Sequence, residues 1–171
     1  MKKLAIVVIL ALSALSVNAQ VKIKFGWVNS AELLDIMPDK KKAAATIDSM
    51  VKAEEAIIKI LNDEYEKKAK ILSTTGASMT PDKLRKAQEE LAKIEDAIYL
   101  QTQTSRDKVS TKEKDLINPI LDKVALAIKD VGKENGYTYI FDISLGQVIV
   151  YPEGDNVLKL VKKKLGLPVM D

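Results

Sequence analysis

The segment from Asp39 to about Leu72 contains no glycine and no proline. The complementary face is rich in Lys, Asp and Glu, and Glu54 stands where a further apolar residue is due. Such spacing predicts a long amphipathic helix. The apolar residues that recur three or four positions apart are Ile47, Val51, Ile58, Leu61, Tyr65, Ala69 and Leu72.

A second helical segment follows after a short break. Residues 73–80 contain Gly76 and lack periodicity, and Thr80-Pro81-Asp82 has the cap, proline and acid that favour a helix start. The apolar stripe weakens over residues 101–105, and Pro119 is expected to kink or divide the helix. The near-heptad apolar residues are Leu84, Ala87, Leu91, Ile94 and Ile98.

Together these segments predict a long antiparallel helical hairpin over residues 39–119, with its tip near residues 73–80. Each arm exceeds 30 residues, which corresponds to about 50 Å at the rise of an α-helix. Arms of this length cannot fold back into a compact ball of this size, so we expect them to project or to pair.

The two ends of the chain look different from the hairpin. Residues 22–28 alternate, with Ile23, Phe25 and Trp27 predicted to face one way and Lys22, Lys24 and Gly26 the other. Two further strands are predicted at 137–143 and 148–151, then a helix capped by Asp155. The fold class is therefore mainly α with a small β body, formed by residues 20–38 and 120–171, into which the hairpin is inserted.

The first residues have the pattern of an export signal. Lys2 and Lys3 precede an apolar run from Leu4 to Val17, and Val17-Asn18-Ala19 offers a small-residue cleavage site. The run of about 14 residues is short for a membrane span, although an uncleaved anchor is the alternative. We therefore interpret residues 1–19 as a cleaved signal peptide of a periplasmic protein.

Composition excludes most catalytic chemistry. The chain has no His and no Cys, which removes Ser-His and Cys-His nucleophiles and the usual zinc sites. The carboxylate pairs Glu54-Glu55 and Glu89-Glu90 point about 100° apart on a helix, so they do not converge. We expect no enzyme activity, cofactor or metal; an enzyme that uses carboxylates alone is the remaining alternative. Glu54 could specify pairing in a coiled coil or mark a wetted inner wall.

Charge is distributed unevenly. Without Lys2 and Lys3 the net charge falls from +3 to +1, which favours no nucleic-acid partner. A cluster of cations flanks the hairpin turn and could contact anionic membrane surfaces or acidic clients. The alternative is an ordinary solvated, lysine-rich helix surface. This basic tip comprises Lys67, Lys68, Lys70, Lys83, Arg85 and Lys86.

The sequence resembles the Skp/OmpH family over nearly the whole mature chain. The most similar stretch is 120–161, which includes Gly132-Lys133-Glu134-Asn135-Gly136-Tyr137, Ile140-Phe141-Asp142 and Asp155-Asn156-Val157. The resemblance implies a homotrimer whose β segments form a central body, with the hairpins as tentacles around a cavity. Unfolded outer-membrane β-barrel proteins would be held there without ATP. A structural or adaptor coiled-coil protein of the envelope is the alternative.

This interpretation assigns residues to two roles. Diffuse client contact is expected from the apolar stripes, whose polar interruptions predict imperfect packing; the trimer body is expected from the strands. The client-contact set is Ile47, Val51, Ile58, Leu61, Leu91, Ile94 and Ile98, and the body set is Phe25, Trp27, Tyr139, Phe141, Val148 and Val150.

The signal interpretation predicts that the mature protein begins at Gln20. Intact mass spectrometry of periplasmic material should give the mass of residues 20–171. Recovery of the full chain in the membrane fraction would contradict it.

Overall fold

The computed structural model describes residues 23–169, so the predicted signal peptide and Gln20 lie outside the described residues. The chain separates into two compact units. Of the described residues, 23–30 and 127–169 form one unit and 31–126 the other. We call them the terminal unit and the hairpin unit.

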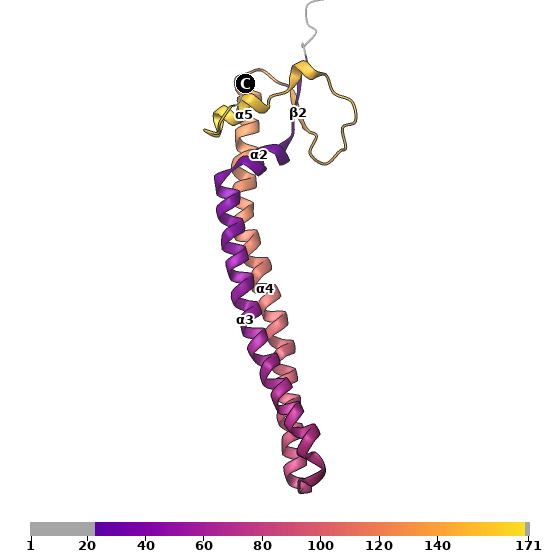
Figure 1. Ribbon diagram of the computed structural model, residues 1–171. Helices are drawn as coiled ribbons and strands as arrows, with labels where there is room; N and C mark the ends of the chain where they lie inside the picture. Colours follow the sequence, from indigo (N-terminus) through magenta and orange to yellow (C-terminus); the bar gives the residue numbers. More distant parts are fainter. Residues whose placement is uncertain (1–22, 170–171) are drawn as a thin grey trace, which may run out of the picture. The chain divides into compact units, whose positions relative to one another are not determined.

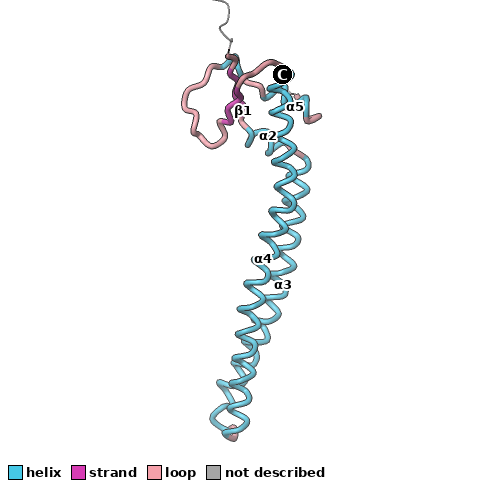
Figure 2. The backbone as a smooth tube through the Cα atoms, turned by 180° about the vertical axis from the view of Figure 1, so that it is seen from behind, coloured by secondary structure: helices cyan, strands magenta, loops and turns pink. Residues whose placement is uncertain are grey.

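The hairpin unit is dominated by two long helices that lie side by side and antiparallel (Figures 1 and 2). Helix α2 (Ser30–Ile36) leads into α3 (Pro38–Thr75), which has 38 residues. A 3-10 turn, η2 (Gly76–Ser78), connects α3 to α4 (Pro81–Glu134), which has 54 residues. The predicted hairpin and its tip are thereby confirmed.

Prolines define where both arms begin. Met37 has an extended backbone and precedes Pro38, which occupies the first turn of α3. At the second arm, Leu84 N–H donates to the Thr80 carbonyl at 3.0 Å, and Pro81 is the first helical residue. Proline suits these positions because the first N–H groups of a helix have no partner inside it.

The expectation that Pro119 divides the second helix is wrong, since α4 runs through it to Glu134. Ile120 and Val124, which follow the proline, are 7% and 3% exposed, so the packing of that face offsets the lost hydrogen bond. Gly136, two residues after the end of the helix, has a φ of +68°. Tyr137 N–H donates to the Gly132 carbonyl at 2.9 Å, as in a Schellman motif.

A 3–4 repeat of less exposed residues forms the contact between the arms, which we call the seam. Its spacing is that of a coiled coil, in which apolar positions repeat every 3.5 residues on average. On α3 the seam contains Ile47, Val51, Glu54, Ile58, Leu61, Tyr65, Lys68 and Leu72. On α4 it contains Leu84, Ala87, Leu91, Ile94, Ile98, Gln101 and Ser105.

The terminal unit contains a two-stranded parallel sheet that joins the two ends of the chain, as predicted. Strand β1 (Phe25–Val28) pairs with β2 (Tyr139–Asp142) in a register that places Phe25 opposite Tyr139 and Val28 opposite Asp142. The most deeply buried side chains of this unit are Val28, Val131, Val157 and Val161.

The predicted alternation left open which side of the first strand faces inward, and in the single chain the side of Phe25 is the more exposed one. Ile23 and Phe25 are 53% and 48% exposed, whereas Gly26 and Val28 are buried. Gly26 faces inward because its surface is in close contact with Tyr137: a Cβ at Gly26 would lie 2.8 Å from that ring. The aromatic side of the sheet is therefore the outer side.

The strand predicted at 148–151 is also wrong, because these residues form a loop in which Ile149 and Val150 are both 88% exposed. No sheet edge is paired with them; Asn156 forms a bridge with Trp27 instead. Asp155 is not the cap of α5 (Leu158–Lys164), because Val157 occupies the N-cap position; just before it, Asn156 Oδ1 accepts a hydrogen bond from Leu158 N–H at 2.9 Å.

Candidate functional site

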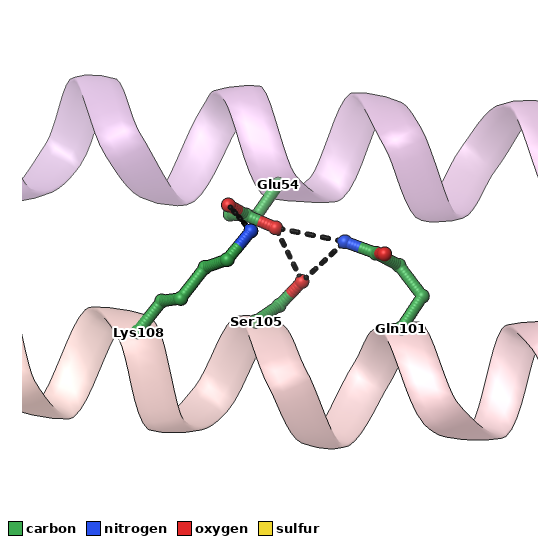
Figure 3. Close-up of polar contacts among 4 residues, drawn as sticks. All are labelled: Glu54, Gln101, Ser105 and Lys108. Atoms are coloured by element: carbon green, nitrogen blue, oxygen red, sulfur yellow. Dashed lines mark hydrogen bonds and ion pairs between the residues drawn. The ribbon is translucent and has the colours of Figure 1, made fainter.

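A polar layer crosses the seam of the hairpin at Glu54 (Figure 3). The side chain of Glu54 is 12% exposed, and one of its oxygens accepts hydrogen bonds from Ser105 Oγ at 2.6 Å and Gln101 Nε2 at 2.9 Å. Its other oxygen lies 3.2 Å from Lys108 Nζ. All three donors belong to α4. The polar run at 101–105, which interrupts the apolar stripe, thus matches the interruption on α3.

These contacts keep Glu54 ionised. The hydrogen bond from Ser105 is the main cause that lowers the pKa of Glu54 from its ordinary value of 4.5, with Lys108 and Gln101 acting in the same direction. Partial burial raises the pKa but does not offset them. The oxygens of Glu54 are therefore matched by donors from α4, and the expectation of imperfect arm packing at this interruption stays a prediction.

Two further ion pairs join the arms and define which residues lie at the same level. Lys123 Nζ is 2.9 Å from Asp39 Oδ2, and Lys68 Nζ is 2.9 Å from Glu90 Oε2. Hydrogen bonding lowers the pKa of both carboxyl groups. Both pairs are substantially exposed, so each contributes little to stability. Together with Glu54 they place residues near 57–60 of α3 beside residues near 97–101 of α4.

The residues predicted to contact clients lie mostly in the seam. Ile94 is 9% exposed and buried, and the other six are half-buried. Those six are Ile47, Val51, Ile58, Leu61, Leu91 and Ile98.

A different set of aliphatic side chains is exposed. Ile57, Ile60 and Leu100 are 43%, 66% and 67% exposed, and Ala53 and Ala97 are exposed beside them. We call these five residues the mid-arm patch. The sequence analysis missed these residues, although the sequence contains a signal for them. Ile57-Ile58 and Ile60-Leu61 are pairs of adjacent apolar residues, and only one residue of each pair can face the seam.

The five residues share one face of the hairpin. A hollow of about 450 Å³ on that face is lined by Met50, Thr104 and Asp107. These positions lie two helical turns from Ile57, Ala97 and Leu100 respectively, and residues seven apart lie on the same side of a helix. A second hollow, of about 400 Å³, is lined by Glu55, Thr102 and Arg106 and marks the other face.

The basic tip is partly neutralised. Lys68 pairs with Glu90, and Arg85 Nη1 lies 2.6 Å from Glu89 Oε1. Among described residues, the cations at the tip that make no ion pair are Lys67, Lys70, Lys83 and Lys86, all exposed.

In the terminal unit, three of the residues predicted for the trimer body form an exposed aromatic face. The ring of Phe25 lies 5.8 Å from that of Tyr139 and 6.1 Å from that of Phe141. Their side chains are between 44% and 56% exposed, so they are not core in the single chain. Trp27 and Val148 are half-buried and, with the exposed Val150, line a hollow of about 460 Å³.

Within residues 23–169 no group of three or more His, Cys, Asp or Glu side chains is placed to hold a metal ion. Over the same range, no helix combines the length and apolar character needed to cross a bilayer.

The lowered pKa of Glu54 predicts an acid-dependent contribution to stability. A carboxyl group whose pKa is lower in the folded protein stabilises it above its unfolded pKa and loses this effect as pH falls through the folded value. The urea midpoint of the parent should therefore fall more between pH 6 and pH 3 than that of Glu54→Gln. Glu55→Gln, on the exposed side of α3, should follow the parent; equal acid sensitivity of parent and Glu54→Gln would contradict the prediction.

Comparisons with known proteins agree with this geometry. Residues 24–165 match the family described as outer membrane protein (OmpH-like). The chaperone protein Skp of Vibrio cholerae is 21% identical over 158 residues, which span 91% of this chain and 93% of that protein. The crystal structure of an OmpH-like outer membrane chaperone from Caulobacter crescentus matches the fold with a TM-score of 0.71 at 13% identity, covering 90% and 92% of the two chains. Because this family consists of chaperones, the expectation that the chain is not an enzyme is confirmed. The chain belongs to the OmpH/Skp family of outer membrane protein chaperones.

Proposed function

We propose that this protein is an ATP-independent periplasmic holding chaperone, which binds unfolded outer-membrane β-barrel proteins and prevents their aggregation. The observation that carries the proposal is the mid-arm patch, a group of exposed aliphatic side chains on one face of the hairpin. Exposed apolar clusters on soluble proteins commonly mark interaction sites.

The chemistry of the patch suits a client that must later be released. Full burial of an Ile or Leu side chain contributes roughly 1.5–3 kcal/mol, and a mobile client would gain only part of that at each contact. Contacts with aliphatic side chains are also non-directional, so they do not require a particular client sequence. Many weak contacts of this kind would hold diverse unfolded chains without a chemical energy source.

The terminal unit supports a homotrimer. Phe25, Tyr139 and Phe141 expose aromatic surface, and the apolar loop residues Ile149 and Val150 are almost fully exposed. A two-stranded sheet is marginal by itself and has open edges. Copies of the chain that meet through this surface would cover it and would hold the hairpins around a shared cavity.

Two further elements complete the proposal. The signal peptide at residues 1–19 would deliver the chain to the periplasm. The four unpaired lysines of the basic tip would make transient contact with anionic membrane surfaces, an attraction that salt weakens.

The structural or adaptor alternative has one observation in its favour. The seam is closed by matched polar and charged pairs such as Glu54 with Ser105, so the hairpin is complete without a client. The holding experiment below separates the two functions.

Assembly is tested by Phe141→Asp. Phe141 is 44% exposed in the single chain, so the charge should be tolerated there but should disrupt an interface that covers it. Sedimentation should give three times the mature mass for the parent and a lower mass for the variant. Leu160→Asp, a 38% exposed residue on α5, is the matched control and should remain trimeric. A folded, monodisperse monomer of the parent would contradict the trimer.

Holding is tested by the triple variant Ile57→Ser, Ile60→Ser and Leu100→Ser. Because these side chains are exposed, thermal stability should change little, while suppression of light scattering by a urea-diluted β-barrel protein should fall several-fold. Each single change should have a small effect because contact is diffuse.

Two controls accompany this assay. Tyr99→Ser removes a side chain that is 68% exposed on the other face and should leave holding intact. Seam changes such as Ile58→Ser with Leu61→Ser should instead lower helical content. Undiminished holding by the folded triple variant would reject the patch as the client site and favour the adaptor alternative.

A further inference from the structure

We propose that Glu54, Gln101, Ser105 and Lys108 act as a positioning device, which we call the Glu54 layer. It fixes the rotation and the axial level of α3 against α4. This alignment places the residues of the mid-arm patch on a single face of the hairpin. The inference rests on the proposed function, because its importance is that it shapes the surface offered to clients.

The layer and the patch adjoin on both helices. Glu54 precedes Ile57 by three residues, and Gln101 directly follows Leu100. A change in the rotation or level of either helix at the layer therefore moves Ile57 and Leu100 relative to each other. Sliding by one heptad would displace them by about 10 Å along the axis, which would split the patch.

Apolar packing is weak at this level of the seam, so it cannot fix the alignment. From Gln101 to Thr111, Val109 is the single large apolar residue that α4 supplies. The hollows of about 450 and 400 Å³ flank the same stretch on the two faces. Apolar contact is also non-directional, and it permits helices to slide or turn against each other.

The hydrogen bonds of the layer are directional instead. The donors Gln101, Ser105 and Lys108 span two turns of α4 and converge on one carboxylate, as Figure 3 shows. The connection at the tip cannot replace them, because Glu54 lies 22 residues, or about 33 Å, from Gly76. Polar residues in coiled-coil seams specify alignment in this way at some cost in stability.

The decisive variant replaces the three members of the layer other than Lys108 by apolar residues: Glu54→Leu, Gln101→Leu and Ser105→Ala. Lys108 is 50% exposed and keeps its contact with water. Because the carboxylate and its two less exposed partners are removed together, no buried polar group is left unsatisfied, so the melting temperature should stay equal or rise. Holding should nevertheless fall several-fold. Glu54→Gln keeps the shape and the acceptor oxygen and should retain most of the holding. Glu90→Gln alters a cross-arm ion pair outside the layer and is the matched control.

Alignment is measured directly by pulsed electron spin resonance between labels at Ser49→Cys and Ser110→Cys. The chain has no native cysteine, and both positions are exposed at about the level of the layer. Labelled protein is diluted with unlabelled protein so that distances within one chain dominate. The parent, Glu54→Gln and Glu90→Gln should give one narrow distance, and the apolar variant a broad or shifted distribution.

Each outcome decides the inference. A narrow, unshifted distance in the apolar variant overturns it, and so does full holding by a variant whose distances have broadened. If the apolar variant fails to fold, Ser105→Ala alone removes the shortest hydrogen bond, and its distance distribution must broaden. Failure of the proposed function would appear separately, as undiminished holding by the serine variant of the patch, and the distances would then still show whether the layer fixes the alignment.

Discussion

The seam between α3 and α4 is the interaction on which the rest of the hairpin depends. Two helices of 38 and 54 residues have far more surface than either can bury alone, and the 3–4 repeat gives each one apolar strip for the other. That strip is narrow. Among the described residues of the strip in the half of the hairpin nearer the tip, Ile94 alone is as little as 9% exposed. The remaining surface of the arms stays available for other molecules.

The terminal unit leaves large apolar side chains exposed. Its interior is occupied by small aliphatic side chains such as Val28, Val157 and Val161, while the larger aromatic residues lie outside. Large rings are the residues that contribute most when they are buried. A unit that covers valines and exposes Phe25 and Phe141 has its most apolar side unpartnered, which is the opposite of what a self-sufficient domain of this size shows.

The starts of the two long helices were predictable because they depend on local spacing and on Pro38 and Pro81. The sequence also predicted a small sheet between the two ends of the chain, but not where the second helix ends. It did not predict which side of β1 faces inward. Alternation reports that two sides differ, but the contact of Gly26 with Tyr137 arises only in the folded unit. The continuation of α4 through Pro119 likewise depends on packing at Ile120 and Val124.

Part of the candidate site could likewise be predicted from the sequence, and part could not. The interruption of the stripe by Glu54 was visible in the sequence, yet its partners were not, since they lie 47 to 54 residues away. The mid-arm patch was missed because a stripe of apolar residues was assigned to clients, whereas the seam uses that stripe and leaves its neighbours Ile57, Ile60 and Leu100 outside.

The parallel pairing of β1 with β2 has a consequence for how the protein is made. Phe25 and Tyr139 are partners separated by more than 100 residues, with the whole hairpin between them. Closing so long a loop from an unfolded chain carries a large entropic cost. The two arms can pair first near the tip, through contacts between residues close in sequence, and then pair progressively away from it. This pairing brings the two strands together. During synthesis β1 emerges first, and its partner β2 follows only after more than 100 further residues, so the growing chain passes through a stage in which this strand is an unpaired, aggregation-prone segment.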